Sequence, residues 1–158
     1  MKLRPHHLLC TQGYSGKGYD SAFIENMTAI TTHLRSDANA AIEIVFSTDD
    51  ICKKCPRMLG VNLCESNAKV KLLDEKVVAY FGIEEKSYIY QDIIREINAK
   101  MTSAIMDDIC GNCEWYPISA CKRNILSPGA QKKRAQPAAK TGDTCASVHV
   151  LSKPGSVS

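Results

Sequence analysis

Seven of the chain's eight cysteines follow a spacing that core packing alone does not explain. Cys10 stands by itself, and the other six form two triplets of nearly equal span, Cys52-x2-Cys55-x8-Cys64 and Cys110-x2-Cys113-x7-Cys121. A C-x2-C turn presents two thiolates to one ion, and a third cysteine on a short loop can close the site. The pattern therefore predicts metal binding by all seven of these cysteines.

Disulfide bonding is the competing explanation for a cysteine-rich chain, and it depends on the compartment. The first ten residues carry basic side chains but lack the apolar stretch of a signal peptide. No apolar run approaches the ~20 residues that a transmembrane helix needs. We therefore expect a cytoplasmic protein with no membrane partner, in which thiols stay reduced and are available to metal.

The distribution of charge separates a body from a tail. Residues 1–121 carry 13 basic and 16 acidic side chains, whereas residues 122–158 carry 7 and 1, so the net charge of +3 belongs to the tail. The tail is rich in Ala, Lys, Pro and Ser, and it lacks both apolar periodicity and aromatic side chains for stacking on bases. We predict a metal-binding domain over residues 1–123 and a disordered basic tail over residues 124–158. Cys145 is expected to be a free thiol, and nucleic acid is not expected as a partner.

Apolar periodicity in the body predicts a mainly α fold, an α+β domain with one or two short strands that metal staples together through two cysteine-rich loops. Pro5 suits the first turn of a short helix that reaches Cys10. The expected elements are helices at residues 20–35, 67–81, 87–101 and 102–108, and a strand at 41–46. Gly82 stands where a helix-ending glycine is expected. Each cysteine triplet is entered through Asp-Asp-Ile, whose acids could cap helices or support the metal loops.

Three arrangements of ligands remain open at this point. The four C-x2-C cysteines could form a single zinc site, which leaves Cys10, Cys64 and Cys121 without roles. Each triplet could instead hold its own metal, with a fourth ligand from Cys10, His6 or His7 for one of them. In the third arrangement, Cys10 and one triplet bind a single iron–sulfur cluster, and the other triplet binds zinc, a second cluster or nothing.

The position of proline favours the iron–sulfur arrangement. Pro56 directly follows Cys55, and bacterial ferredoxin sequences place a proline after a ligating cysteine. The leading prediction is an iron–sulfur cluster of the [4Fe–4S] type, with Zn²⁺ as the alternative cofactor. Its expected ligands are Cys10, Cys52, Cys55 and Cys64, and the second triplet forms another metal site.

The polar residues beside Cys10 are the candidates for chemistry. Arg4, His6 and His7 lie within six residues of Cys10. They could stabilise a thiolate-rich cluster, bind an anionic or carbonyl substrate, or supply a general base. The competing interpretation gives one histidine a capping or core role and leaves the other facing solvent.

Several segments together resemble a family catalogued as a domain of unknown function, DUF1284, whose members are small bacterial and archaeal proteins. The resemblance is carried by Leu3 to Cys10, Gly16 to Tyr19, Asn26-Met27, Asp49 to Pro56, and Cys110 to Trp115. It covers about residues 2–121 and implies an iron–sulfur protein whose signature is Arg4, His6, His7 and the seven cysteines. The resemblance implies no reaction.

Three functional hypotheses follow. The leading one is a cytoplasmic iron–sulfur protein for electron transfer, redox sensing or chemistry at an open iron, with a redox partner protein or a small anionic ligand. The second is a zinc-stabilised structural or binding module without catalytic activity. The third is a metal-dependent enzyme that uses Arg4, His6 and His7 at an open metal site.

Overall fold

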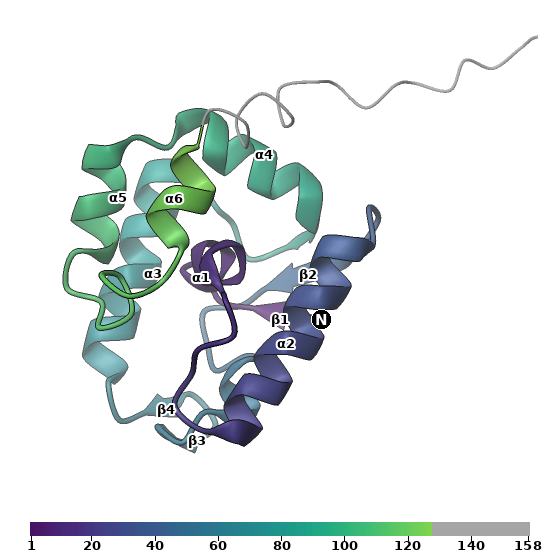
Figure 1. The fold of residues 1–158 in the computed structure, drawn as a ribbon, viewed down its shortest axis with the longest axis vertical. Helices are drawn as coiled ribbons and strands as arrows, with labels where there is room; N and C mark the ends of the chain where they lie inside the picture. Colours follow the sequence, from purple (N-terminus) through teal and green to yellow (C-terminus); the bar gives the residue numbers. More distant parts are fainter. Residues whose placement is uncertain (128–158) are drawn as a thin grey trace, which may run out of the picture.

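The computed structural model describes residues 1–127 of the 158-residue chain (Figure 1). Only residues 124–127 of the expected tail fall in this range, and Cys145 lies outside the described residues. The expectation of a mainly helical body is confirmed. The helices are α1 (His7–Gly13), α2 (Ser21–Ser36), α3 (Asn67–Phe81), α4 (Tyr90–Lys100), α5 (Ser103–Cys110) and α6 (Cys121–Leu126).

Local signals in the sequence set the ends of three of these helices. The Asp20 carboxylate accepts a hydrogen bond from the Phe23 N–H at 2.8 Å and caps α2. Thr102 caps α5 in the same way. Gly82 ends α3 at φ 68°, a left-handed conformation that glycine adopts without steric cost, as its position predicted. Within the described residues, no helix combines the length and apolar character needed to cross a membrane.

A three-stranded sheet of order β1-β2-β5 lies beside the helices. Strand β2 (Ala41–Ile44) pairs in parallel with β1 (Lys2–Leu3) and antiparallel with β5 (Ser87–Ile89). The expected helix at residues 87–101 is wrong in its first three residues, because Ser87 to Ile89 pair with β2 instead. The Tyr and Ile of this segment favour a strand, and the edge of β2 supplies hydrogen-bond partners that the local pattern does not reveal.

The loop of the first cysteine triplet is more regular than its sequence suggested. A short 3₁₀ turn, η1 (Cys52–Lys54), leads into a hairpin of β3 (Met58–Gly60) and β4 (Leu63–Cys64). Asn62 has φ 58° at the turn of the hairpin, a conformation that Asn tolerates better than most residues. The pairing of Cys64 with Met58 carries the third cysteine back towards the C-x2-C turn.

Helix α1 lies in the middle of the molecule and holds the second triplet in place through α6 (Figure 1). Leu8 and Leu9 of α1 are buried in the core, as is Ile125 of α6. The two helices approach so closely that a Cβ built on Gly13 would lie 2.0 Å from the Cys121 Sγ. Helix α6 was not predicted from the sequence, and it runs three residues past the expected domain boundary at residue 123.

Candidate metal centre

One cavity of about 190 Å³ is lined by all seven cysteines of the spacing pattern. None of these seven forms a disulfide. Arg4, His6 and His7 also line the cavity, and the remainder of its wall is mostly apolar. A space of ~10–15 Å³ on this measure holds one water molecule, so the cavity is far larger than a single ion requires. The residues that the sequence analysis singled out are therefore brought together around one space.

Both C-x2-C motifs adopt the same hydrogen-bonded turn. The Cys55 N–H donates to the Cys52 carbonyl oxygen at 2.9 Å, and the Cys113 N–H donates to the Cys110 carbonyl oxygen at 2.8 Å. The first turn is η1, and the second follows the C-terminal end of α5. Each turn thus presents its pair of thiols on one side of the backbone, the arrangement that metal-binding knuckles use.

The thiol of Cys10 belongs electrostatically with the second triplet. Its pKa is raised well above the ordinary value by burial and then by the charges of Cys121, Cys113 and Cys110. Burial together with Cys121 and Cys113 likewise raises the pKa of Cys110 to about 12. Four sulfur atoms in one buried place repel one another as thiolates, and a cation would relieve that repulsion.

This grouping differs from the one expected from the sequence, which joined Cys10 to Cys52, Cys55 and Cys64. The difference arises from α6, because its packing against α1 lays Cys121 beside the helix that carries Cys10. These two helices lie more than 100 residues apart in the chain, so the spacing of the cysteines cannot predict their contact.

The first triplet occupies the other part of the cavity wall. Burial raises the pKa of Cys55, and the charge of the neighbouring Cys64 adds to the shift. Burial and the nearby Asp49 carboxylate raise the pKa of Cys52 to about 12. A ring nitrogen of His7, a carboxylate oxygen of Asp49 and the Cys52 sulfur lie within 4.8 Å of one another.

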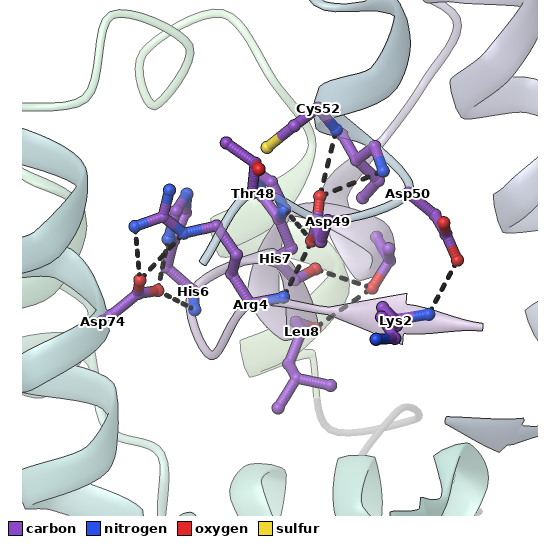
Figure 2. A network of polar contacts seen from close by, with 12 residues as sticks. Lys2, Arg4, His6, His7, Leu8, Thr48, Asp49, Asp50, Cys52 and Asp74 are labelled. Carbon is purple, nitrogen blue, oxygen red and sulfur yellow. Dashed lines mark hydrogen bonds and ion pairs between the residues drawn. The ribbon is translucent and has the colours of Figure 1, made fainter. Parts of the chain in front are cut away.

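Asp49 is buried and accepts four hydrogen bonds (Figure 2). Its Oδ2 accepts hydrogen bonds from the Arg4 N–H at 2.7 Å and from His7 Nδ1 at 2.6 Å. Its Oδ1 accepts from the backbone N–H groups of Ile51 and Cys52, each at 3.0 Å. Burial alone would raise the pKa of this carboxyl, but the His7 charge, its hydrogen bond and the backbone donors hold the pKa well below its ordinary value. Asp49 is therefore an ionised acceptor whose four lone-pair positions are filled.

Asp74, on α3, has the same kind of environment on the other side of the two histidines (Figure 2). Its Oδ1 accepts from the His6 N–H at 3.1 Å and from His6 Nδ1 at 2.6 Å, and its Oδ2 accepts from Arg4 Nε at 2.9 Å and lies 2.8 Å from Arg4 Nη2. All three side chains are buried. The opposing effects of burial and of these donors leave the pKa of Asp74 below its ordinary value. The Arg4 charge is thus neutralised inside the protein.

The two carboxylates determine which nitrogen of each histidine carries the proton. Because Asp49 and Asp74 only accept, we assign the proton to Nδ1 of both His7 and His6. Burial and the neighbouring His7 lower the pKa of His6 to about 4 despite Asp74, so His6 is neutral at pH 7. Among the described residues, none forms a hydrogen bond or ion pair with either Nε2 atom, and both side chains line the cavity.

A cluster of side chains at the cavity wall joins the two knuckles. The Tyr19 hydroxyl donates to Glu114 Oε1 at 2.6 Å, and Arg57 Nη2 donates to Glu114 Oε2 at 3.1 Å. The Arg57 guanidinium lies 5.0 Å from the centre of the Tyr19 ring, and Trp115 meets that ring edge-on. Arg57 follows the first C-x2-C turn and Glu114 the second, so this cluster links the two cysteine loops.

Comparison with known proteins adds a family but no relative of known function. No curated protein and no solved structure matches the chain. A family model described as a protein of unknown function, DUF1284, matches residues 18–119. The matched range holds Asp49, Asp74 and five of the seven cysteines, and it leaves out Cys10 and Cys121 together with Arg4, His6 and His7. The match spans well over half of the sequence, and the chain belongs to the DUF1284 family.

Proposed function

We propose that this protein is a cytoplasmic iron–sulfur protein whose cluster is held by the thiolates of Cys10, Cys110, Cys113 and Cys121. The observation that carries the proposal is the placement of these four thiols on the wall of one cavity, where α1, which carries Cys10, packs closely against α6 at Cys121. When bound, such a cluster supplies one-electron transfer. A redox partner protein is then the natural source or acceptor of the electron.

The donor set and the space beside it both support a cluster. Four cysteine thiolates are the usual ligands of [4Fe–4S] and [2Fe–2S] clusters. A single ion would fill only a small part of a cavity of about 190 Å³, whereas iron and sulfide together require more room. The mostly apolar wall would keep water from the cluster sulfurs, and burial of this kind is one determinant of reduction potential.

The same four thiols also satisfy the tetrahedral preference of zinc, so the alternative of a zinc-stabilised module has support of its own. Four-cysteine zinc sites are closed and structural, and they contribute directly to folding free energy. The catalytic alternative has less support. Arg4 is bound to Asp74, and a histidine with a pKa of about 4 is a weak base at neutral pH.

Metal analysis of protein prepared without oxygen tests the proposal. The full-length chain is purified anaerobically, its iron, acid-labile sulfide and zinc are measured, and its visible spectrum is recorded before and after dithionite. We expect iron and sulfide in near-equal amounts and absorption that bleaches on reduction. Replacement of Cys10 or Cys121 by serine should remove most of that absorption. A colourless protein with stoichiometric zinc and no sulfide would refute the cluster and favour the structural alternative.

A further inference from the structure

We infer that the Nε2 atom of His7 is a metal ligand, which completes a second metal centre with the thiolates of Cys52, Cys55 and Cys64. The inference rests on the proposed function, because it presumes that the cysteines bind metal. It adds a ligand set of three thiolates and one imidazole, and it gives Asp49 the role of a positioning residue. It applies whether the metal at this centre is zinc or iron.

Asp49 lies beside His7 and Cys52 but is not itself a ligand. Ligand atoms bound to one tetrahedral zinc at ~2.0–2.1 Å lie about 3.3 Å apart. Asp49 Oδ2 and His7 Nδ1 are only 2.6 Å apart, which is the length of a strong hydrogen bond. The other acceptor positions of Asp49 are taken by backbone N–H groups of Arg4, Ile51 and Cys52. The proximity of His7, Asp49 and Cys52 therefore reflects a histidine that a carboxylate orients.

Nε2 is the nitrogen of His7 that remains for a metal. The Nδ1–H of His7 donates a hydrogen bond to Asp49, so only Nε2 of this ring can offer a lone pair to a metal ion. Metal-binding histidines are commonly arranged in this way, since a carboxylate on one nitrogen fixes the ring and makes the other nitrogen a stronger ligand. His7 lines the cavity beside Cys52, and no described residue forms a hydrogen bond with its Nε2.

The number of ligands also favours His7. Cys10 lies on α1, which packs closely against α6 at Cys121, so Cys10 completes the second triplet to four thiols and the first triplet is left with three. Structural zinc requires four ligands, and three cysteines with one histidine form a common zinc site. In iron–sulfur centres, replacement of cysteine by histidine raises the reduction potential. His6 is a poorer candidate, because its Asp74 partner lies on the other side of the histidine pair, away from Cys52 (Figure 2).

Titration of the metal-free, reduced, full-length protein with Co²⁺ alone tests the ligand set without presuming the native metal. Thiolate-bound Co²⁺ shows charge-transfer bands in the near ultraviolet, and its visible bands differ between sites with four sulfurs and sites with three sulfurs and one nitrogen. We expect two equivalents of Co²⁺ in the wild type, one at each kind of site. The His7→Ala variant should bind one equivalent and retain the four-sulfur spectrum. The His7→Cys variant should again bind two, both with four-sulfur spectra.

The outcomes separate this inference from the proposed function. Two equivalents in His7→Ala, with the spectrum of the wild type, would overturn the ligand role of His7 and leave cysteine metal binding intact. Absence of thiolate bands in the wild type would overturn both. If His7→Ala does not fold, His7→Cys decides. A change of its second site to a four-sulfur spectrum supports the inference, and a spectrum identical to the wild type refutes it.

Discussion

At the scale of single residues, the carboxylates of Asp49 and Asp74 organise the polar side of the cavity. Each accepts hydrogen bonds at all four of its lone-pair positions, and each orients one histidine. Burying a carboxylate is costly unless it is paired and hydrogen-bonded, and this saturation offsets the cost. The arrangement also leaves little freedom for replacement, because every donor would lose its acceptor.

Replacement of Asp74 by alanine should strongly destabilise the fold. The change leaves the Arg4 guanidinium buried without a counter-charge, and loss of one partner from a buried ion pair costs about 3–5 kcal/mol. Urea denaturation of metal-free protein measures the change in free energy of unfolding. Asp108→Ala is the matched control, since it removes an exposed partner of Lys76, which lies on the same helix as Asp74, and should change stability little. Equal effects of the two changes would contradict this account of Asp74.

Replacement of Asp49 by asparagine should weaken the second metal centre although every metal ligand remains. The NH₂ group of asparagine must face either His7 and Arg4 or the Ile51 and Cys52 N–H groups. In either orientation it faces other hydrogen-bond donors, so hydrogen bonds to that side of residue 49 are lost. Loss of such a supporting carboxylate typically lowers metal affinity about 10–100-fold. Competition titration with Co²⁺ measures the loss. Asp50→Asn alters the neighbouring, more exposed carboxylate and should leave the Co²⁺ affinity within a factor of a few.

The roles of these residues were only partly predictable. Asp49 precedes the first knuckle directly, so its spacing suggested that it caps or supports the loop, and it does accept the Cys52 N–H. Asp74 lies within a helical pattern between apolar positions, where an acid ordinarily faces solvent. Its burial follows from the placement of Arg4 and His6, which are about 70 residues away in sequence. Nothing in the sequence around Asp74 indicates that its partners lie so far away in the chain.

At the scale of elements, the close packing of α1 on α6 brings Cys10 and Cys121 together, and Gly13 makes that packing possible. Replacement of Gly13 by alanine would place a Cβ 2.0 Å from the Cys121 Sγ and 2.6 Å from its Cα. Overpacking of this kind costs about 1–3 kcal/mol and would push α6 away from α1. We expect a lower melting temperature and loss of the four-sulfur Co²⁺ site that Cys10 forms with the second triplet. The Co²⁺ site of the first triplet should be retained.

Gly60→Ala is the control for that prediction. An added Cβ on Gly60, in β3 of the hairpin, meets no atom within 4 Å. Both substitutions remove the conformational freedom of a glycine, but only Gly13→Ala introduces a clash. Thermal unfolding followed by circular dichroism and Co²⁺ titration of both variants should therefore differ. A Gly13→Ala protein that binds Co²⁺ at four sulfurs as the wild type does would show that α6 is not required for the site.

The elements themselves could be predicted to a large extent, because most helices bury one periodic apolar face and carry local end signals such as Asp20 and Gly82. The elements predicted from the sequence were wrong where pairing with residues distant in the chain determines the structure. Strand β5 forms against β2, and the hairpin β3–β4 forms in a loop whose alternating apolar residues Leu59, Val61 and Leu63 are exposed instead of buried. Helix α6 has only six residues and depends on α1 for its burial.

At the scale of the whole molecule, two knuckles that are 58 residues apart in sequence converge on one cavity. The spacing of the cysteines was sufficient to predict metal binding by each triplet, but it could not show that both triplets share a space. Convergence depends on the central position of α1 and on the cluster of Tyr19, Arg57 and Glu114 that joins the two loops. Besides burial, the charges of Cys121, Cys113 and Cys110 raise the pKa of Cys10, and the charge of Cys64 raises that of Cys55.

Metal binding by the metal-free protein should accordingly release protons even in alkaline solution. Five thiols have raised pKa values, chiefly through burial: Cys10, Cys52, Cys55, Cys110 and Cys121. A group with a raised pKa keeps its proton to a higher pH, so at pH 9 these thiols are less ionised than an ordinary thiol of pKa about 8.5. Each must lose its proton to bind metal, and apparent affinity therefore rises with pH throughout this range.

Calorimetric titration with Zn²⁺ in buffers of different ionisation enthalpy measures the protons released per chain. Between pH 7 and pH 9 we expect a smaller decrease than exposed thiols would show, because the raised pKa values of these five thiols keep their protons bound to a higher pH. Protein unfolded in urea is the control, since its exposed thiols have ordinary pKa values and should release far fewer protons at pH 9 than at pH 7. The same steep decrease in the folded protein would contradict the raised pKa values of these five thiols and the proposed grouping of Cys10 with the second triplet.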